Sequence, residues 1–282
     1  MKSNHLSNYY ISFNKLQKAL NEKTNFRLKY DYCNQYTLQK MKKLSDVNIP
    51  SAFKKKEIIT NVSCIDAISK VLDEMDEDKI IDFFETSLYY ARFIEKDIDV
   101  EESKSRVLLD NSKLLFEVIV PNTDHNSDLL NASIIHELAH FSLIYCKDNV
   151  DYLEYSETLP IFFEYMSYCA LDKENGYDCF INNRLGMLKA NIEDLKQDIM
   201  YALNPSYLNI AQENYVYSIA SNITYLESIE FVLQLIEARK NEKTSIDKLI
   251  GRALVGEETL KGMEEKIGLK VSNHQKIYEL CR

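Results

Sequence analysis

The scarcity of glycine and proline constrains the fold of this chain more than any other feature. Its 282 residues include six glycines and four prolines, and the first glycine is Gly176. Average usage would give roughly twenty glycines. Because turns depend on these residues, the pattern argues against an all-β fold and predicts long helices. It also argues against a glycine-rich nucleotide loop, since the one late candidate, GRALVGEE, lacks the required lysine.

The charge and cysteine patterns exclude several classes of partner. The chain has 34 basic and 44 acidic residues, a formal net charge of −10 that repels nucleic acid, so no nucleic-acid partner is expected. Its six cysteines are widely spaced without a CxxC pair, so we expect reduced thiols. The N-terminal residues lack an apolar run of signal-peptide length, and no stretch approaches eighteen uncharged apolar residues. We therefore expect a cytoplasmic protein with no membrane partner.

Three segments have recognisable local patterns. Apolar residues at four-residue steps, Ile80, Phe84 and Leu88, predict an amphipathic helix. Residues 105–120, SRVLLDNSKLLFEVIV, are rich in β-branched and apolar side chains around a DNS turn, and they predict a β-hairpin. A helix is predicted to resume after Ser127, its N-cap, with Asp128 in the first turn. The chain is therefore predicted to be mainly α with a small β-hairpin or sheet.

The segment SIIHELAHFSLIY contains an H-E-x-x-H arrangement of His136, Glu137 and His140. The run has no proline or glycine and is compatible with a helix. Four residues advance a helix by roughly 6 Å and return to almost the same face, so both imidazoles can reach one zinc ion. Glu137 lies one step around the helix, where it can approach a metal-bound water as general base without being a ligand.

A catalytic zinc ion usually has three protein ligands, so a further donor is expected nearby. The segment YLEYSETLPIFFEYM offers Glu157 and Glu164, seven residues apart and hence on one face of a continuous helix. Pro160 would be costly deep inside a helix, so we expect a helix start near Ser156 or a kink. Spacing alone does not choose between the two glutamates.

From about Phe116 to Ser228, the chain resembles the oligoendopeptidase F and thimet oligopeptidase family of zinc metallopeptidases. The resemblance rests on VPNTDHNSDLLNASIIHELAH and ETLPIFFE. It implies that Glu157 is the third zinc ligand and that Glu164 orients a metal-bound imidazole. The connection from the motif to Glu157 is shorter than is usual in the family, and counting without a deletion favours Glu164.

The segment ENYVYSIASNITYL resembles the family's tyrosine-bearing segment, in which a phenol faces the substrate carbonyl. Tyr217 is the better match and Tyr215 the second. A phenol could donate a hydrogen bond to the developing oxyanion.

The family resemblance implies a zincin-like helical metallopeptidase that uses Zn²⁺ to hydrolyse oligopeptides. Residues 1–100 are expected to form an N-terminal helical region and one wall of the cleft, and residues 101–282 one compact catalytic, zinc-binding region. The expected partner is a peptide or small protein substrate, and the sequence leaves the oligomeric state open. Two alternatives stay open: a dedicated regulatory or precursor-processing protease, and a non-catalytic helical peptide-binding protein.

Overall fold

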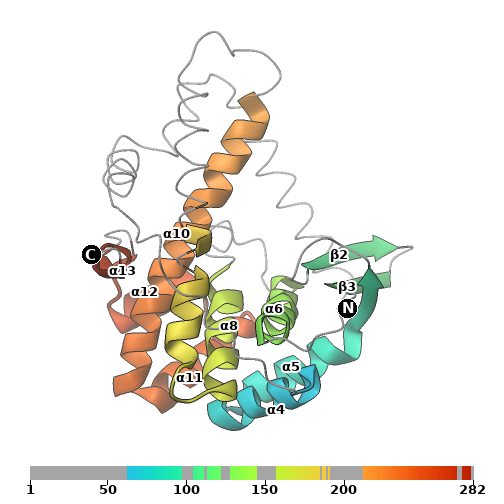
Figure 1. The fold of residues 1–282 in the computed structure, drawn as a ribbon, viewed down its shortest axis with the longest axis horizontal. Coiled ribbons are helices and arrows are strands. Elements are labelled where there is room, and N and C mark those ends of the chain that lie inside the picture. Colours follow the sequence, from blue (N-terminus) through green and yellow to red (C-terminus); the bar gives the residue numbers. More distant parts are fainter. Residues whose placement is uncertain are drawn as a thin grey trace.

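The computed structural model describes residues 62–96, 104–110, 113–121, 128–144, 157–184, 186–188, 190, 212–271 and 275–280. In this part of the chain, helices pack around one hydrophobic core, with a small sheet at one side (Figure 1). Phenylalanine accounts for eight of the ten largest fully buried side chains. Edge-to-face contacts between these rings, such as the 4.8 Å pair of Phe84 and Phe163, join helices distant in sequence.

Two helices open the described part of the chain. Helix α4 spans Cys64–Met75 and begins at Ser63, whose hydroxyl accepts a hydrogen bond from the backbone N–H of Asp66 at 3.1 Å. Helix α5 spans Asp78–Tyr90 and confirms the helix predicted from apolar residues at four-residue steps. Ile80 and Phe84 are buried in the core.

The sheet has three strands in the order β1-β3-β2. Strands β2 (Lys104–Asp110) and β3 (Lys113–Pro121) are antiparallel, which confirms the predicted hairpin. Strand β1 (Ala91–Lys96) pairs with β3 in parallel and was not predicted. Its sequence, ARFIEK, has three charged residues in six and its side chains are mostly exposed, so it carries no alternating apolar signal.

Two buried helices form the centre of the fold. Helix α6 spans Asp128–Ala139 and continues as the 3₁₀-helix η1, His140–Ile144. The predicted N-cap, Ser127, lies outside the described residues. Helix α8 spans Thr158–Leu171 and packs along α6. Both are buried over most of their surface, as expected for helices without a continuous polar face. Polar side chains on their contacting faces therefore need partners inside the protein.

The remaining helices lie in the C-terminal part of the chain, and the longest of them packs against α8. Residues 176–184 are helical, and α10 (Gln212–Asn241), α11 (Lys243–Leu254), α12 (Leu260–Ile267) and α13 (Gln275–Leu280) follow. Glu230 of α10 is fully buried, and its carboxylate accepts the backbone N–H groups of Lys276 and Ile277 at 3.0 and 2.9 Å. These amides lie in the first turn of α13, where backbone N–H groups have no carbonyl acceptor within the helix.

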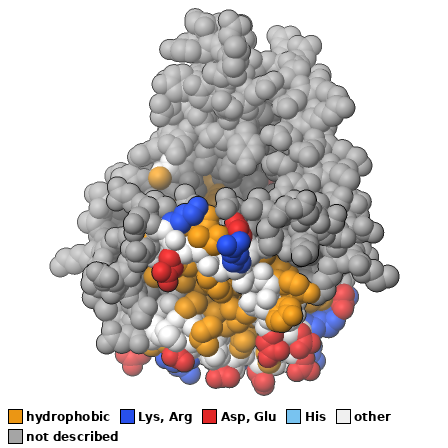
Figure 2. Space-filling model, turned by 90° about the vertical axis from the view of Figure 1, so that its right-hand side faces the viewer, with side chains coloured by type: hydrophobic (Ala, Val, Ile, Leu, Met, Phe, Trp, Pro, Cys, Tyr) orange, Lys and Arg blue, Asp and Glu red, His pale blue; other side chains and the backbone are white. Residues whose placement is uncertain are grey.

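The described architecture is mainly α, with the sheet next to α6, as the sequence predicts. The division of the chain at residue 100 stays a prediction. Figure 2 shows a face whose lower rim carries acidic and basic side chains, with apolar side chains above them. Among the residues that the structure describes, the helices are too short or too polar to span a lipid bilayer.

Candidate metal centre

The two histidines of the H-E-x-x-H motif lie one turn apart, His136 in the last turn of α6 and His140 at the start of η1. Their ring centroids are 5.0 Å apart and the ring planes meet at 73°. Both rings are largely buried, with side-chain exposures of 9% and 14%. The helical path across residues 136–140 thus brings both imidazoles to one side of α6, as the four-residue spacing predicts.

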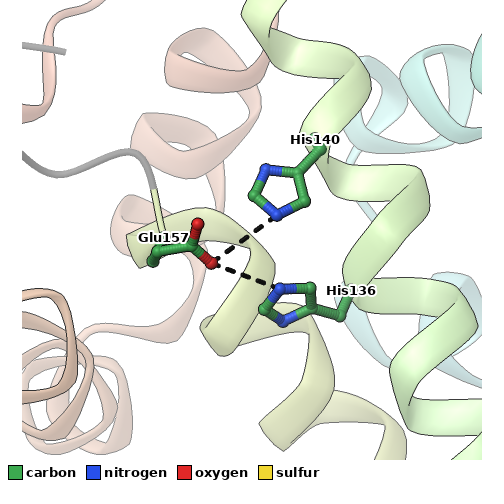
Figure 3. A group of neighbouring side chains, drawn as sticks. All are labelled: His136, His140 and Glu157. Carbon is green, nitrogen blue, oxygen red and sulfur yellow. Dashed lines mark ion pairs between the residues drawn. The ribbon is translucent and has the colours of Figure 1, made fainter. Parts of the chain in front are cut away.

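Glu157 faces both rings from the neighbouring helix. It is the N-cap residue of α8, and its side chain caps no backbone group of that helix. Its Oε2 atom is 3.3 Å from Nε2 of His136 and 3.5 Å from Nε2 of His140 (Figure 3). The structure therefore brings together three of the residues predicted as metal ligands.

The position of Glu157 follows from how α8 begins. Helix α8 starts at Thr158, so Pro160 falls in its first turn, where the missing N–H of proline costs no helical hydrogen bond. The helix start near Ser156 that the proline predicts is therefore confirmed within two residues. As the residue just before the helix, Glu157 lies at the end of α8 that faces the two histidines (Figure 3).

The donor atoms fit a zinc ion. Nε2 of His136, Nε2 of His140 and a carboxylate oxygen of Glu157 all lie within 4.8 Å of one another. Tetrahedral zinc with ligands at about 2.0–2.2 Å requires donors roughly 3.3–3.6 Å apart. The two measured separations between the carboxylate and the imidazoles, 3.3 and 3.5 Å, are within this range. Two imidazoles and one carboxylate also match the donor set of catalytic zinc sites, which leave one position to solvent.

The surroundings of Glu157 favour its charged form. Burial raises the pKa of this carboxyl group, but the charges of His140 and His136 and their hydrogen bonds outweigh burial and hold the pKa well below its usual value. The side chain is therefore a carboxylate at neutral pH, which is the form that binds a cation.

Glu164 lies on the other side of the His136 ring and is more buried than Glu157, with side-chain exposures of 3% and 21%. Its Oε2 is 3.3 Å from Nδ1 of His136, although the ring as oriented makes no hydrogen bond through that nitrogen. The carboxylate is buried, and it accepts hydrogen bonds from Nε of Arg184 at 3.0 Å and from the Asn183 amide at 3.2 Å. A second guanidinium nitrogen of Arg184 also contacts it. Glu164 thus faces the ring nitrogen that points away from Glu157.

Glu137 points from α6 toward the sheet. Its Oε2 accepts two hydrogen bonds from Ser105 of β2, one from the backbone N–H at 2.8 Å and one from the hydroxyl at 2.5 Å. Glu137 is not one of the three side chains whose donor atoms converge.

Sequence reasoning missed Ser105, Asn183 and Arg184. Ser105 lies in the predicted hairpin but belongs to no motif. Asn183 and Arg184 lie in the helical residues 176–184, where no sequence pattern marks them as site residues. Tyr215 and Tyr217 lie in the first turns of α10, but their side chains are outside the described part of the structure. Their role stays a prediction.

Comparisons with known proteins give one structural likeness. No family model matches the chain, and no curated protein matches its sequence. Among solved structures, the chain is similar to a crystal structure described as that of "a putative oligoendopeptidase F from Bacillus anthracis str. Ames", with a TM-score of 0.59 and 13% identity. The match covers 95% of this chain and 60% of that one. The chain therefore has this fold and spans about three fifths of that protein's length.

Proposed function

We propose that this protein is a zinc-dependent metallopeptidase that hydrolyses peptide bonds in oligopeptides. The observation that carries the proposal is the convergence of His136, His140 and Glu157 on one point, with separations that suit zinc. The fold shared with a protein described as an oligoendopeptidase supports the peptidase assignment. If the two histidines shared a helix face only by chance, nothing would explain a carboxylate from another helix beside both rings.

In the proposed site, each acidic residue has a different task. His136, His140 and Glu157 are the ligands. Glu164, whose Oε2 is 3.3 Å from Nδ1 of His136, would orient that imidazole by accepting its N–H. When bound there, zinc would supply Lewis-acid chemistry to the scissile carbonyl and to water. Glu137 would accept the proton of the attacking water and deliver it to the leaving nitrogen. Tyr217, or Tyr215 as the second choice, donates a hydrogen bond to the oxyanion.

Activity against mixed peptides tests the role of Glu137. We expect the zinc-loaded wild type to cleave them and Glu137→Gln to lose at least about a hundredfold in kcat, the range of a missing general base. Glu85→Gln, on the exposed surface of α5, is the matched control and should retain wild-type activity. Equal hydrolysis by wild type and Glu137→Gln would remove Glu137 from the mechanism.

Metal analysis separates the two glutamates. Glu157→Ala should lose zinc after dialysis against a weak chelator, because a ligand is gone. Glu164→Gln should still bind zinc, with affinity reduced about 10- to 100-fold, the usual effect of removing a group that orients a ligand. The opposite pattern would make Glu164 the ligand.

The same assays identify the alternatives. Cleavage of a single protein or precursor, but not of mixed peptides, would indicate a dedicated processing protease. Peptide binding without turnover at any zinc loading would indicate a non-catalytic binding protein.

A further inference from the structure

One contact next to the candidate metal centre has no role in the function proposed above. Ser105 donates both its backbone N–H and its hydroxyl to the same oxygen, Oε2 of Glu137. The two residues are 32 positions apart and belong to β2 and α6. Both donors come from one residue, so a single position on the strand determines where this oxygen lies.

The backbone N–H of Ser105 is not used in the pairing of β2 with β3. Ser105 lies opposite Val118 in the antiparallel register of β2 and β3. Its N–H is donated to Glu137 instead of to the neighbouring strand. In an antiparallel pair, alternate residues direct their N–H groups away from the partner strand. Within the described sheet β2 is an edge strand, and Glu137 binds to its open side at this point.

The contact is strong for a hydrogen bond between a side chain and a strand. Its lengths, 2.8 Å from nitrogen and 2.5 Å from oxygen, are typical of bonds to an ionised carboxylate. Both residues are partly buried, so water competes weakly for the same groups. Fixing Oε2 also fixes the rotation of the carboxylate. Within the described residues, Oε1 has no such partner.

We propose that Ser105 is a positioning residue for Glu137: it holds Oε2 so that Oε1 is presented to the attacking water. This proposal rests on the proposed peptidase function. Water would lose a proton to Oε1 as its oxygen bonds to the peptide carbon. Oε1 would then deliver that proton to the leaving nitrogen as the carbon–nitrogen bond breaks. Ser105 itself exchanges no proton and touches no reacting atom.

Kinetics test the hydroxyl. Ser105→Ala keeps the backbone N–H but removes the second donor, so the carboxylate can rotate. We expect kcat to fall about tenfold, the effect of one lost hydrogen bond to a charged group, with KM changed less than twofold. Ser105→Thr keeps the hydroxyl on a β-compatible residue and should recover most of kcat. Ser87→Ala, which removes a buried hydroxyl bonded to the Phe84 carbonyl on α5, is the matched control and should retain wild-type kcat.

Amide exchange tests the contact without activity or zinc. In the metal-free protein, the Ser105 amide should exchange slowly with solvent, as measured by NMR. Glu137→Ala should speed its exchange at least tenfold, while amides of the β2–β3 ladder change little. Fast exchange in wild type, or no change in Glu137→Ala, would overturn the contact.

The two measurements separate this proposal from the proposed function. If wild type cleaves peptides and Glu137→Gln does not, but Ser105→Ala has wild-type kcat, the positioning role is refuted and the peptidase assignment stands. If Ser105→Ala lowers kcat and Ser105→Thr does not restore it, the hydroxyl is not the cause and the proposal fails. If wild type cleaves no peptide, the proposed function fails, and the exchange of the Ser105 amide still decides whether Glu137 is held.

Discussion

Replacing Arg184 by methionine should lower the free energy of unfolding by about 3 kcal/mol. Arg184 and Glu164 have side-chain exposures of 6% and 3%, so solvent screens their interaction little. Removing one partner of such a buried pair costs about 3–5 kcal/mol, because the other charge stays buried and uncompensated. We expect the lower end of this range, since the Asn183 amide still donates to Glu164 at 3.2 Å. Methionine keeps most of the apolar volume of the arginine side chain.

The measurement is urea unfolding of the metal-free protein, which excludes any contribution from bound zinc. The double variant Glu164→Gln/Arg184→Met should be more stable than Arg184→Met by at least about 1 kcal/mol, because glutamine leaves no buried charge. Arg252→Met is the matched control. Arg252 is exposed and its ion pairs with Glu257 and Glu258 are 3.9 and 3.8 Å long, so it should change stability by less than about 0.5 kcal/mol. An Arg184→Met variant as stable as wild type, or a double variant less stable than the single one, would refute the reasoning.

Two further predictions concern a glycine and a cysteine. Gly176→Ala should destabilise the protein by about 1–3 kcal/mol in urea unfolding, because a Cβ atom there would lie 2.4 Å from the Tyr168 carbonyl oxygen and 2.6 Å from Cα of Cys169. At Gly186, a Cβ atom would meet no described residue within 4 Å, so Gly186→Ala should be neutral or slightly stabilising. Equal effects at both glycines would contradict the packing argument. Burial raises the pKa of the Cys64 thiol to about 12, so the unreactive protonated form dominates at pH 8.5. Mass spectrometry should find its alkylation about a hundredfold slower in native than in urea-unfolded protein, and similar rates in both states would refute this.

The helical character of the fold and the two histidines could be predicted from sequence because both depend on local spacing. Scarce glycine predicts long helices, and the four-residue separation of His136 and His140 determines that they share a helix face. The prediction of Glu157 as the third ligand depended on the family resemblance, because the seven-residue spacing left either Glu157 or Glu164 possible. Pro160 predicted a helix start near Ser156 or a kink, and α8 begins at Thr158, so the position of Glu157 just before the helix came from the structure.

The contacts that support the site could not be predicted, because they join residues that only tertiary packing brings together. Ser105 reaches Glu137 across 32 positions, and Arg184 reaches Glu164 across 20. Neither residue type is unusual in its segment, so no local pattern distinguishes it from a surface serine or arginine. Strand β1 could not be predicted for a related reason. Its mostly exposed residues show no apolar alternation, and it is a strand because it pairs with β3.

The buried carboxylate of Glu230 has a consequence for the end of the chain. Helix α13 has six residues, far fewer than an isolated helix needs to persist in water. Its first turn depends on one side chain from α10, which accepts two of its backbone amides. The C-terminal helix is therefore held by tertiary contacts, namely the Glu230 carboxylate at its first turn and the burial of Ile277 in the core. Truncating Glu230 would leave two amides of α13 without this acceptor and should loosen the attachment of the helix to α10.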